Sequence, residues 1–222
     1  EWLGKKFYSF NNIIRALNSK IQTNKRYSFK TLSANKKHSK ALIIGGGHSI
    51  NLHKEALKEF IKTEEELIII YSSSRYLNFF NTYDRLQYIC LIGNENERIG
   101  KLDGEIKNIN LVIPPAPREI GTFIPDGLDH ITFELDDIEL TDEKIATHCS
   151  ISIQTAISLG LKKVFIAGFD GYMNQNKGSK EMELFRENDL FFNNAQKKLE
   201  IISLTPTLYS NINTESIYSL IK

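Results

Sequence analysis

Three consecutive glycines, followed by a histidine and a serine, are the residues whose types and spacing best suit ligand binding: Gly45, Gly46, Gly47, His48 and Ser49. They lie between an apolar run and a segment with helical spacing. Glycines let backbone N–H groups approach a phosphate, and the N-terminus of the following helix adds partial positive charge. We therefore predict that the three glycines and Ser49 bind an anionic group, with His48 as a candidate catalytic residue. The alternative is a tight turn without a ligand, since the run matches neither the dinucleotide-binding fingerprint nor a P-loop.

A second polar run follows the next apolar segment. Ser72, Ser73, Ser74 and Arg75 supply hydroxyls and one guanidinium, which suit a ribose, a sugar hydroxyl or a phosphate. We predict that Ser72, Ser73 and Arg75 contact the same ligand as the glycines. The alternative is an ordinary capping loop in which Ser74 is the N-cap of a short helix.

A histidine precedes a helical segment in the run Thr147-His148-Cys149-Ser150. His148 is the first candidate for a general base, or for a hydrogen bond to a phosphate, because an imidazole changes its charge near neutral pH. Ser150 is predicted to bind the ligand and to be the N-cap of the helix. The alternative is an incidental polar histidine in a loop.

The remaining candidates follow two apolar runs in the C-terminal half. Gly168, Asp170 and Tyr172 come after one run, and Thr205 and Thr207 flank a proline after the other. A carboxylate at a strand end can hold a ribose, a metal or a substrate amine, and a tyrosine adds a stacking face. We predict that Asp170 is catalytic and that the other four bind the ligand. The alternative for Asp170 is a turn built on Asp-Gly.

The spacing of histidine and cysteine predicts no metal site. His48 and His53 lie five residues apart across a turn and a helix start, which is poor geometry for two ligands of one metal. Cys90 and Cys149 form neither a zinc pattern nor a disulfide framework. Such sparse use of cysteine is typical of a reducing cytoplasm, where we expect the chain to reside.

Apolar runs alternate with amphipathic segments along most of the chain. The runs 41–44, 67–71 and 163–167 are almost entirely apolar, as expected for strands covered on both faces. Further strands are predicted at 87–92, 109–113, 131–135 and 200–204, and helices at 52–62, 151–159, 181–198 and 214–221. This alternation predicts an α/β, Rossmann-like fold with a mostly parallel sheet and helices on both faces. Ligands of such sheets bind at the carboxyl ends of the strands, where the polar runs above lie.

Length and charge limit the class of protein. The 222 residues suffice for one sizeable domain, and a net charge of +1 argues against a broad nucleic-acid or membrane footprint. No apolar run approaches the roughly 20 residues that span a bilayer. We predict a nucleotide-binding-like domain at 41–222. Residues 1–40, with a helix at 9–20 and a basic stretch after it, are predicted to be a lead-in and linker from a missing upstream domain.

Several stretches together resemble one known domain. They are Glu1–Ser9, Ile44–Gly47, Ala167–Tyr172, Glu181–Met182, Ser203–Tyr209 and Ser216–Tyr218. They look like the C-terminal domain of aldolase-type proteins, which are similar to 4-hydroxy-2-oxovalerate aldolase and HMG-CoA-lyase-like TIM barrels and appear with surface-polysaccharide biosynthesis. The resemblance implies a fused upstream TIM-barrel aldolase. It carries over none of the barrel's catalytic residues.

A second, more distant resemblance concerns function. The pattern of a strand, Gly-x-Gly-x-Ser and a helix, together with residues 155–172, is similar to bacterial CMP-sialic-acid-dependent sialyltransferases and archaeal pterin pyrophosphokinase-like proteins. In the sialyltransferases the glycine turn and the segment matching 205–207 hold CMP, which implies a cytidine or other nucleotide here. Their catalytic histidine follows the segment matching 168–172, whereas this sequence has no histidine beyond His148. Sialyl transfer by that mechanism is therefore not implied.

These observations predict a nucleotide or nucleotide-sugar binding domain that is glycosyltransferase-like and serves surface-polysaccharide biosynthesis. The candidate bases are His148, Asp170 and His48, in that order. The alternative is a non-catalytic accessory domain of the fused aldolase. A phosphoryl transferase is disfavoured because the glycine loop lacks a lysine and no acidic metal pair is evident.

Overall fold

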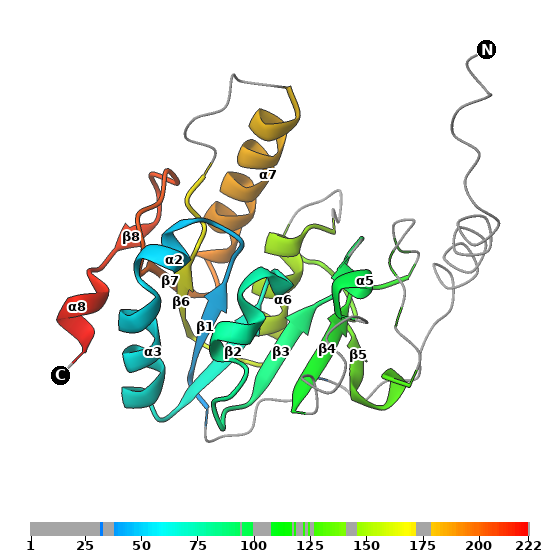
Figure 1. Ribbon diagram of the computed structural model, residues 1–222. Coiled ribbons are helices and arrows are strands. Elements are labelled where there is room, and N and C mark those ends of the chain that lie inside the picture. The colour runs from blue at the N-terminus through cyan, green and yellow to red at the C-terminus, as the bar shows by residue number, and fades with distance from the viewer. Residues whose placement is uncertain are drawn as a thin grey trace, which may run out of the picture.

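The computed structural model of the protein describes residues 32, 38–93, 95–99, 108–116, 118, 122, 124, 127–140, 146–171 and 179–221 (Figure 1). The helix predicted at 9–20 and the candidate Tyr172 lie outside these residues. In the described part of the chain, no helix has the length and apolarity that crossing a bilayer requires.

The core is one parallel sheet. Its strands are β1 (Lys40–Ile44), β2 (Leu67–Tyr71), β3 (Gln87–Cys90), β4 (Ile109–Ile113), β5 (Thr132–Glu134), β6 (Lys163–Ala167), β7 (Glu200–Ser203) and β8 (Asn213–Thr214). They pair in the order β5-β4-β3-β2-β1-β6-β7-β8, and every pairing is parallel. The predicted Rossmann-like α/β fold is confirmed.

Helices cover both faces of this sheet, which explains why the strands are apolar throughout (Figure 1). Ala41 and Ile43 of β1 pack in one core cluster with α6 (His148–Ser158) and α7 (Ser179–Ala195). Leu42 of the same strand packs in the other cluster with α3 (Lys54–Thr63), α4 (Leu77–Phe80) and α8 (Ile217–Leu220). Successive side chains of a strand point to opposite faces, so β1 contributes to both cores.

Short elements complete the carboxyl side of the sheet. They are α2 (Ser49–Leu52), α5 (Glu95–Ile99) and the 3₁₀ turn η1 (Ser74–Tyr76). A second 3₁₀ turn, η2 (Asp129–Ile131), leads into the start of β5. The helix predicted at 52–62 is therefore two helices, α2 and α3. They are separated at His53, whose φ of −111° and ψ of 15° depart from helical values. Leu52, the last residue of α2, is 68% exposed.

Two predicted N-caps are corrected. Thr147 caps α6 in place of Ser150: the Thr147 side chain accepts from the Ser150 N–H at 3.0 Å, and the Ser150 Oγ accepts from the Thr147 N–H at 2.8 Å. This reciprocal pair is a capping box, and it places Ser150 inside the first turn. Likewise Ser73, not Ser74, caps η1, since its Oγ accepts from the Arg75 N–H at 3.3 Å.

Two C-terminal boundaries also differ from the prediction. The helix predicted at 181–198 spans Ser179–Ala195 as α7. The segment predicted as a helix at 214–221 begins as strand β8 instead, because Asn213 and Thr214 pair with Ile202 and Ser203 of β7. Only Ile217–Leu220 is helical there.

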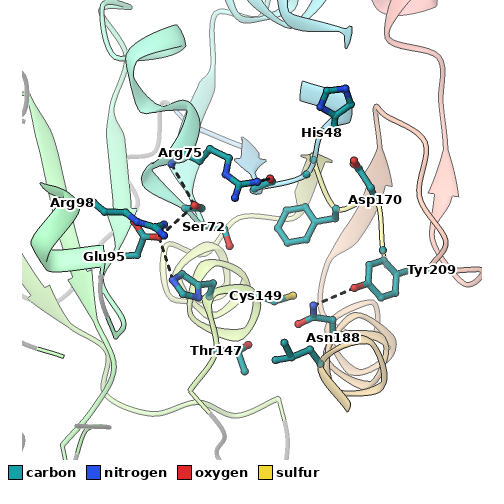
Figure 2. A pocket seen from close by; sticks show the side chains of 18 residues that line it. His48, Ser72, Arg75, Glu95, Arg98, Thr147, Cys149, Asp170, Asn188 and Tyr209 are labelled. Carbon is teal, nitrogen blue, oxygen red and sulfur yellow. Dashed lines mark hydrogen bonds and ion pairs between the residues drawn. The ribbon is translucent and has the colours of Figure 1, made fainter. Parts of the chain in front are cut away.

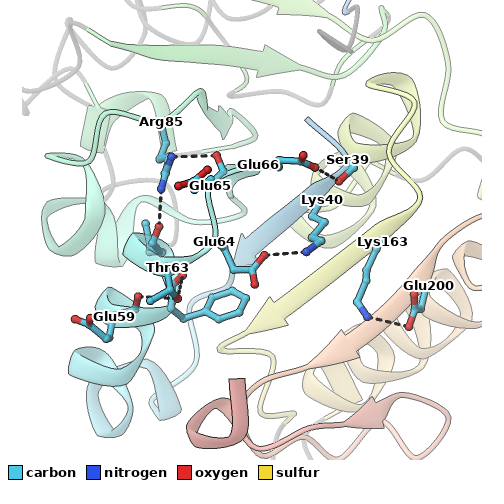
Figure 3. A network of polar contacts seen from close by, with 12 residues as sticks. Ser39, Lys40, Glu59, Thr63, Glu64, Glu65, Glu66, Arg85, Lys163 and Glu200 are labelled. Carbon is cyan, nitrogen blue, oxygen red and sulfur yellow. Dashed lines mark hydrogen bonds and ion pairs between the residues drawn. The ribbon is translucent and has the colours of Figure 1, made fainter. Parts of the chain in front are cut away.

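The amino edge of the sheet is closed by polar contacts (Figure 3). Lys40 at the start of β1 pairs with Glu64 at 2.9 Å, and Lys163 at the start of β6 pairs with Glu200 at 3.1 Å. Arg85 donates to the carbonyl of Ile61 at the end of α3 at 3.2 Å. At the opposite edge, the chain leaves β1 for β2 on one side and later returns to β6 on the other. Such a reversal of strand order separates the loops and makes room for a ligand.

Candidate functional site

A cavity of about 610 Å³ lies at the carboxyl edge beside this reversal (Figure 2). It is lined by the loops that follow β1, β2 and β6 and by residues of α5, α6 and α7. The predicted site residues that line it are Gly46, Gly47, His48, Ser72, Ser73, Arg75, His148, Gly168 and Asp170. The fold thus brings together polar runs from four parts of the sequence, and their role in binding stays a prediction.

The loops after β1 and β6 bond directly to each other. We call residues 45–49 and 168–170 the glycine junction. The Gly45 N–H donates to the Ala167 carbonyl and the Gly47 N–H to the Gly168 carbonyl, each at 2.8 Å. These two amides are occupied within the protein, so the N–H groups of Gly45 and Gly47 are not free to donate to a phosphate in this structure.

The spacing of the junction explains two of its glycines. A Cβ on Gly45 would overlap the Gly168 carbonyl oxygen, and one on Gly47 would lie 2.6 Å from that same oxygen. A Cβ on Gly46 would have ordinary room, since its nearest neighbour, Ser73, is 3.7 Å away. Gly45 and Gly47 are therefore required by the close approach of two backbones. Only Gly46 has no such steric reason.

Asp170 completes the junction. Its Oδ2 accepts from the Ser49 N–H at 2.9 Å, and its Oδ1 accepts from the Ser49 hydroxyl. Both carboxylate oxygens thus hold the start of α2, while the side chain still borders the cavity. Asp170, which was predicted to be catalytic, therefore links the loop after β6 to the loop after β1.

A second carboxylate, which the sequence analysis did not identify, lies at the next strand ends. The Glu95 side chain is 4% exposed and opens helix α5. Its Oε2 accepts from the Ser74 N–H at 3.1 Å and from the Ser74 hydroxyl, and its Oε1 lies 3.4 Å from the Ser73 hydroxyl. We call residues 72–75 together with Glu95, Arg98 and His148 the charged corner.

A guanidinium and an imidazole face the other oxygen of Glu95. The Arg98 Nη1 lies 2.8 Å from Oε1, and the His148 Nε2 lies 3.6 Å from it. Burial alone would raise the pKa of Glu95, but the interaction with His148 and the bonds from the Ser74 side chain and backbone outweigh burial and lower the pKa to about 2. Glu95 is therefore a carboxylate at neutral pH.

Arg75 joins the charged corner to the glycine junction. Its Nη1 donates to the Gly46 carbonyl at 2.7 Å, which holds the exposed guanidinium at the cavity. Within the described ranges, Arg75 forms no ion pair with a carboxylate. A guanidinium has five N–H donors, so most of those on Arg75 remain available to an anion.

The opposite wall of the cavity is aromatic and neutral. In Figure 2 Asn188 and Tyr209 lie across from Arg75 and Glu95. The Asn188 amide donates to the Tyr209 hydroxyl at 3.1 Å, and the Tyr209 ring stacks on Phe185 with centroids 4.7 Å apart. A ring or sugar face could pack on this side while a charged group faces the arginines.

Several predicted residues support the cavity without lining it. The Thr205 hydroxyl accepts from the Gly168 N–H at 3.0 Å, and the Thr207 hydroxyl donates to the Phe169 carbonyl at 2.7 Å. Both threonines fix the loop after β6 and are not among the residues that line the cavity, whereas Tyr209 of the same segment does line it. Ligand binding by the threonines stays a prediction. Gly45, Ser49 and Ser150 are also buried behind the wall.

Sequence reasoning missed Glu95, Arg98 and Asn188, which all line the cavity. Glu95 and Arg98 follow the predicted strand at 87–92, so the rule that ligands meet carboxyl ends of strands would have found them. Asn188 carries no comparable signal, because it lies within the long helix α7. In the described part of the chain, no group of three or more His, Cys, Asp or Glu residues could hold a metal ion.

Fold and site together define a Rossmann-like α/β domain with a polar cavity at its switch point. No family model and no curated protein matches the chain. Among solved structures it is similar to the MAf glycosyltransferase from Magnetospirillum magneticum AMB-1, with a TM-score of 0.56 and 15% identity over 92% of this chain. The chain spans only 38% of that protein's length.

A second solved structure is that of the sialyltransferase CstII from Campylobacter jejuni in complex with the substrate analogue CMP-3FNeuAc. It matches with a TM-score of 0.40 and 14% identity, covering 79% of this chain and 87% of that one. At such identities the first likeness establishes the fold, and the second is too weak to carry an argument. Neither protein is named as an aldolase, so the resemblance to an aldolase-associated domain stays a prediction.

Proposed function

We propose that the cavity binds a nucleotide-sugar and that the chain is a glycosyltransferase-like domain. The observation that carries this proposal is Arg75. Its guanidinium is fixed at the cavity by the Gly46 carbonyl and has no carboxylate partner in the described ranges. A positioned guanidinium without a counter-charge is a receptor for a phosphate, which it can bind with two parallel hydrogen bonds.

The shape and chemistry of the cavity support the same ligand. A volume of about 610 Å³ lies within the roughly 300–1,000 Å³ typical of small-molecule sites. The charged corner suits the phosphates, and the wall with Asn188 and Tyr209 suits a ring and its hydroxyls. A nucleotide-sugar combines these parts. The shared fold with a glycosyltransferase agrees with this use, and a role in surface-polysaccharide biosynthesis belongs to the same proposal.

His148 is the base of the proposed transfer. It lines the cavity, and 45% of its side chain is exposed there. Asp170 is a weaker candidate because both of its oxygens already accept hydrogen bonds from Ser49. His48 is exposed and also lines the cavity, but no described carboxylate pairs with it.

Isothermal titration with CMP, CDP, UDP and GDP tests the binding step. We expect the wild type to bind at least one of the four nucleotides. Arg75→Gln should raise the dissociation constant of that nucleotide roughly 10- to 100-fold, because a hydrogen bond to a charged group contributes about 1.5–3 kcal/mol.

Lys163→Gln is the matched control. It removes one cation at the amino edge of the sheet, where Lys163 pairs with Glu200, and should leave the affinity unchanged. Flat titrations with all four nucleotides would remove the support for the proposal. An equal loss of affinity in both variants would show that net charge, not Arg75, governs binding.

A further inference from the structure

We propose that Glu95 is a positioning residue for His148: it keeps the imidazole proton on Nε2 and leaves Nδ1 as an open base at the cavity. The catalytic use of that base rests on the proposed function. The protonation arrangement itself does not, and it can be tested without any ligand.

Glu95 is held in one place by its own bonds. Its Oε2 accepts from the backbone N–H and the hydroxyl of Ser74, both from the loop after β2. The side chain is almost fully buried. Because one oxygen is fixed by Ser74, the other oxygen, Oε1, has a defined direction toward α6 and His148.

The two nitrogens of His148 differ in their surroundings. Nε2 is buried, lies 3.6 Å from Glu95 Oε1, and has no hydrogen-bond partner among the described residues. Nδ1 is not one of the buried atoms that lack a partner, and it makes no hydrogen bond with the described residues. The His148 side chain borders the cavity. Nε2 therefore lies beside the carboxylate, and Nδ1 is the ring nitrogen that is not enclosed.

The charge of Glu95 decides which nitrogen carries the proton. A carboxylate with a pKa of about 2 can only accept hydrogen bonds at neutral pH. A neutral imidazole has one donor and one acceptor, so a proton on Nε2 leaves a lone pair on Nδ1. The distance of 3.6 Å is longer than a hydrogen bond. Catalytic hydrogen bonds are commonly long without substrate and shorten when it binds.

Arg98 offers a competing explanation for Glu95. Its Nη1 lies 2.8 Å from the same Oε1, so Glu95 could serve only to neutralise Arg98. The Arg98 side chain is 57% exposed, however, and an exposed partner gains little from such a pair. A carboxylate oxygen can accept from both groups at once. The experiment below separates the two explanations.

In the proposed transfer, an acceptor hydroxyl attacks the anomeric carbon of the bound nucleotide-sugar. The new bond joins the acceptor oxygen to that carbon, and the bond from the carbon to the phosphate oxygen breaks. The electron pair leaves with the nucleotide phosphate, and the hydroxyl proton passes to His148 Nδ1. Glu95 then stabilises the imidazolium through Nε2–H, as the carboxylate of a catalytic triad does. The proton is released to water after product departure.

The test is ¹⁵N NMR of protein labelled at histidine, recorded at about pH 9 so that imidazoles of ordinary pKa, about 6.5, are neutral. His148→Gln identifies the His148 signals among those of the five histidines. We expect the wild-type His148 to carry its proton on Nε2. In Glu95→Gln the amide oxygen should remain with the Ser74 N–H, so the amide NH₂ faces His148 and moves the proton to Nδ1.

Arg98→Gln is the matched control, since it removes the other partner of Oε1 and should leave the proton of His148 on Nε2. A proton on Nδ1 in the wild type would overturn the proposal, even if Glu95→Gln failed to fold. The same holds if a folded Glu95→Gln keeps the wild-type tautomer. Failure of nucleotide binding in the titrations above would overturn the proposed function and leave this result standing.

Discussion

The glycine junction and the charged corner are both built on a carboxylate paired with a serine, but the two carboxylates use their oxygens differently. In each, a carboxylate at one strand end accepts from the N–H and the hydroxyl of a serine at another: Asp170 from Ser49, and Glu95 from Ser74. In Asp170, each carboxylate oxygen accepts from one of the two donors. In Glu95, Oε2 accepts from both donors, and Oε1 faces Arg98, His148 and the Ser73 hydroxyl.

This difference shows that the polar groups of a motif can all be hydrogen-bonded within the protein, which leaves none for a ligand. At the junction, the amides of Gly45 and Gly47 and both oxygens of Asp170 are occupied by protein groups. The junction therefore supports the cavity. At the corner, the second oxygen of a buried carboxylate meets the Arg98 guanidinium and the His148 imidazole, and such unequal environments are where proton-transfer groups are found. The corner therefore carries the proposed chemistry.

The largest expected effect is a loss of stability when the glycine junction is disrupted. In Gly45→Ala, the new methyl group would overlap the Gly168 carbonyl oxygen and would lie 2.9 Å from the Gly168 carbonyl carbon. Neither atom can move without shifting backbone, so we expect the free energy of unfolding to fall by about 3 kcal/mol. Chemical denaturation followed by circular dichroism measures this change.

Gly46→Ala is the control within the same motif. Its methyl group would meet nothing closer than 3.7 Å, and no positive φ occurs at residues 45–47. We expect a change within about 0.5 kcal/mol, because the smaller entropy of the unfolded chain offsets minor strain. Equal losses in the two variants would show that the glycines are not required by the approach of the two loops.

The next effect concerns the charged corner and is a loss of unfolding free energy at acid pH. In the unfolded chain Glu95 takes up its proton near the ordinary glutamate pKa of 4.5, whereas in the folded protein its pKa is about 2. Its contribution is therefore complete above pH 4.5 and is lost as the pH falls toward 2. The expected loss is roughly 2–3 kcal/mol. Unfolding free energies measured between about pH 6 and pH 2.5 should decline more steeply in the wild type than in Glu95→Gln.

Glu59→Gln controls for the loss of one negative charge, since this carboxylate on α3 is 47% exposed and pairs with Lys62 at the surface. Its pH profile should parallel that of the wild type. If Glu95→Gln instead follows the wild-type profile over the whole range, the carboxylate at the corner is not the stabilising anion described here.

The two regions also differ in how far the sequence predicted them. Strands such as β1 and β2 were predictable because both faces of the sheet are covered, which requires runs such as 41–44 and 67–71 to be apolar throughout. The polar residues of the junction follow those runs directly. Their purpose was not predictable, because the partners of Gly45 and Gly47 lie more than a hundred residues away in the chain.

Glu95 was missed for the opposite reason. It lies in the run Asn94-Glu95-Asn96-Glu97-Arg98, whose composition is typical of a solvated surface. What buries it is the serine loop after β2, which lies beside it only because β2 and β3 are neighbours in the sheet. Burial set by strand order has no counterpart in local composition. The position of Glu95 after the strand at 87–92 was therefore readable from the sequence, but its burial and its partners were not.

The smallest expected effect is on the first turn of α6, which carries His148 of the charged corner. Thr147 caps α6 immediately before His148, and its Oγ1 accepts from the Ser150 N–H at 3.0 Å. Thr147→Ala should cost about 1 kcal/mol, the usual value for a lost N-cap. Hydrogen exchange at the Ser150 amide should then quicken roughly fivefold if it proceeds through opening of this turn.

Thr147→Ser keeps the accepting oxygen and should retain the wild-type exchange rate. The amides of Gly45 and Gly47 should be unaffected in both variants, because their partners are the carbonyls of Ala167 and Gly168 rather than any atom of α6. If Thr147→Ala speeds exchange equally at the junction, then the two regions open together, and the separation between a supporting junction and a reactive corner does not hold. Exchange confined to α6 would mean that His148 can be displaced while the loops that frame the cavity remain in place.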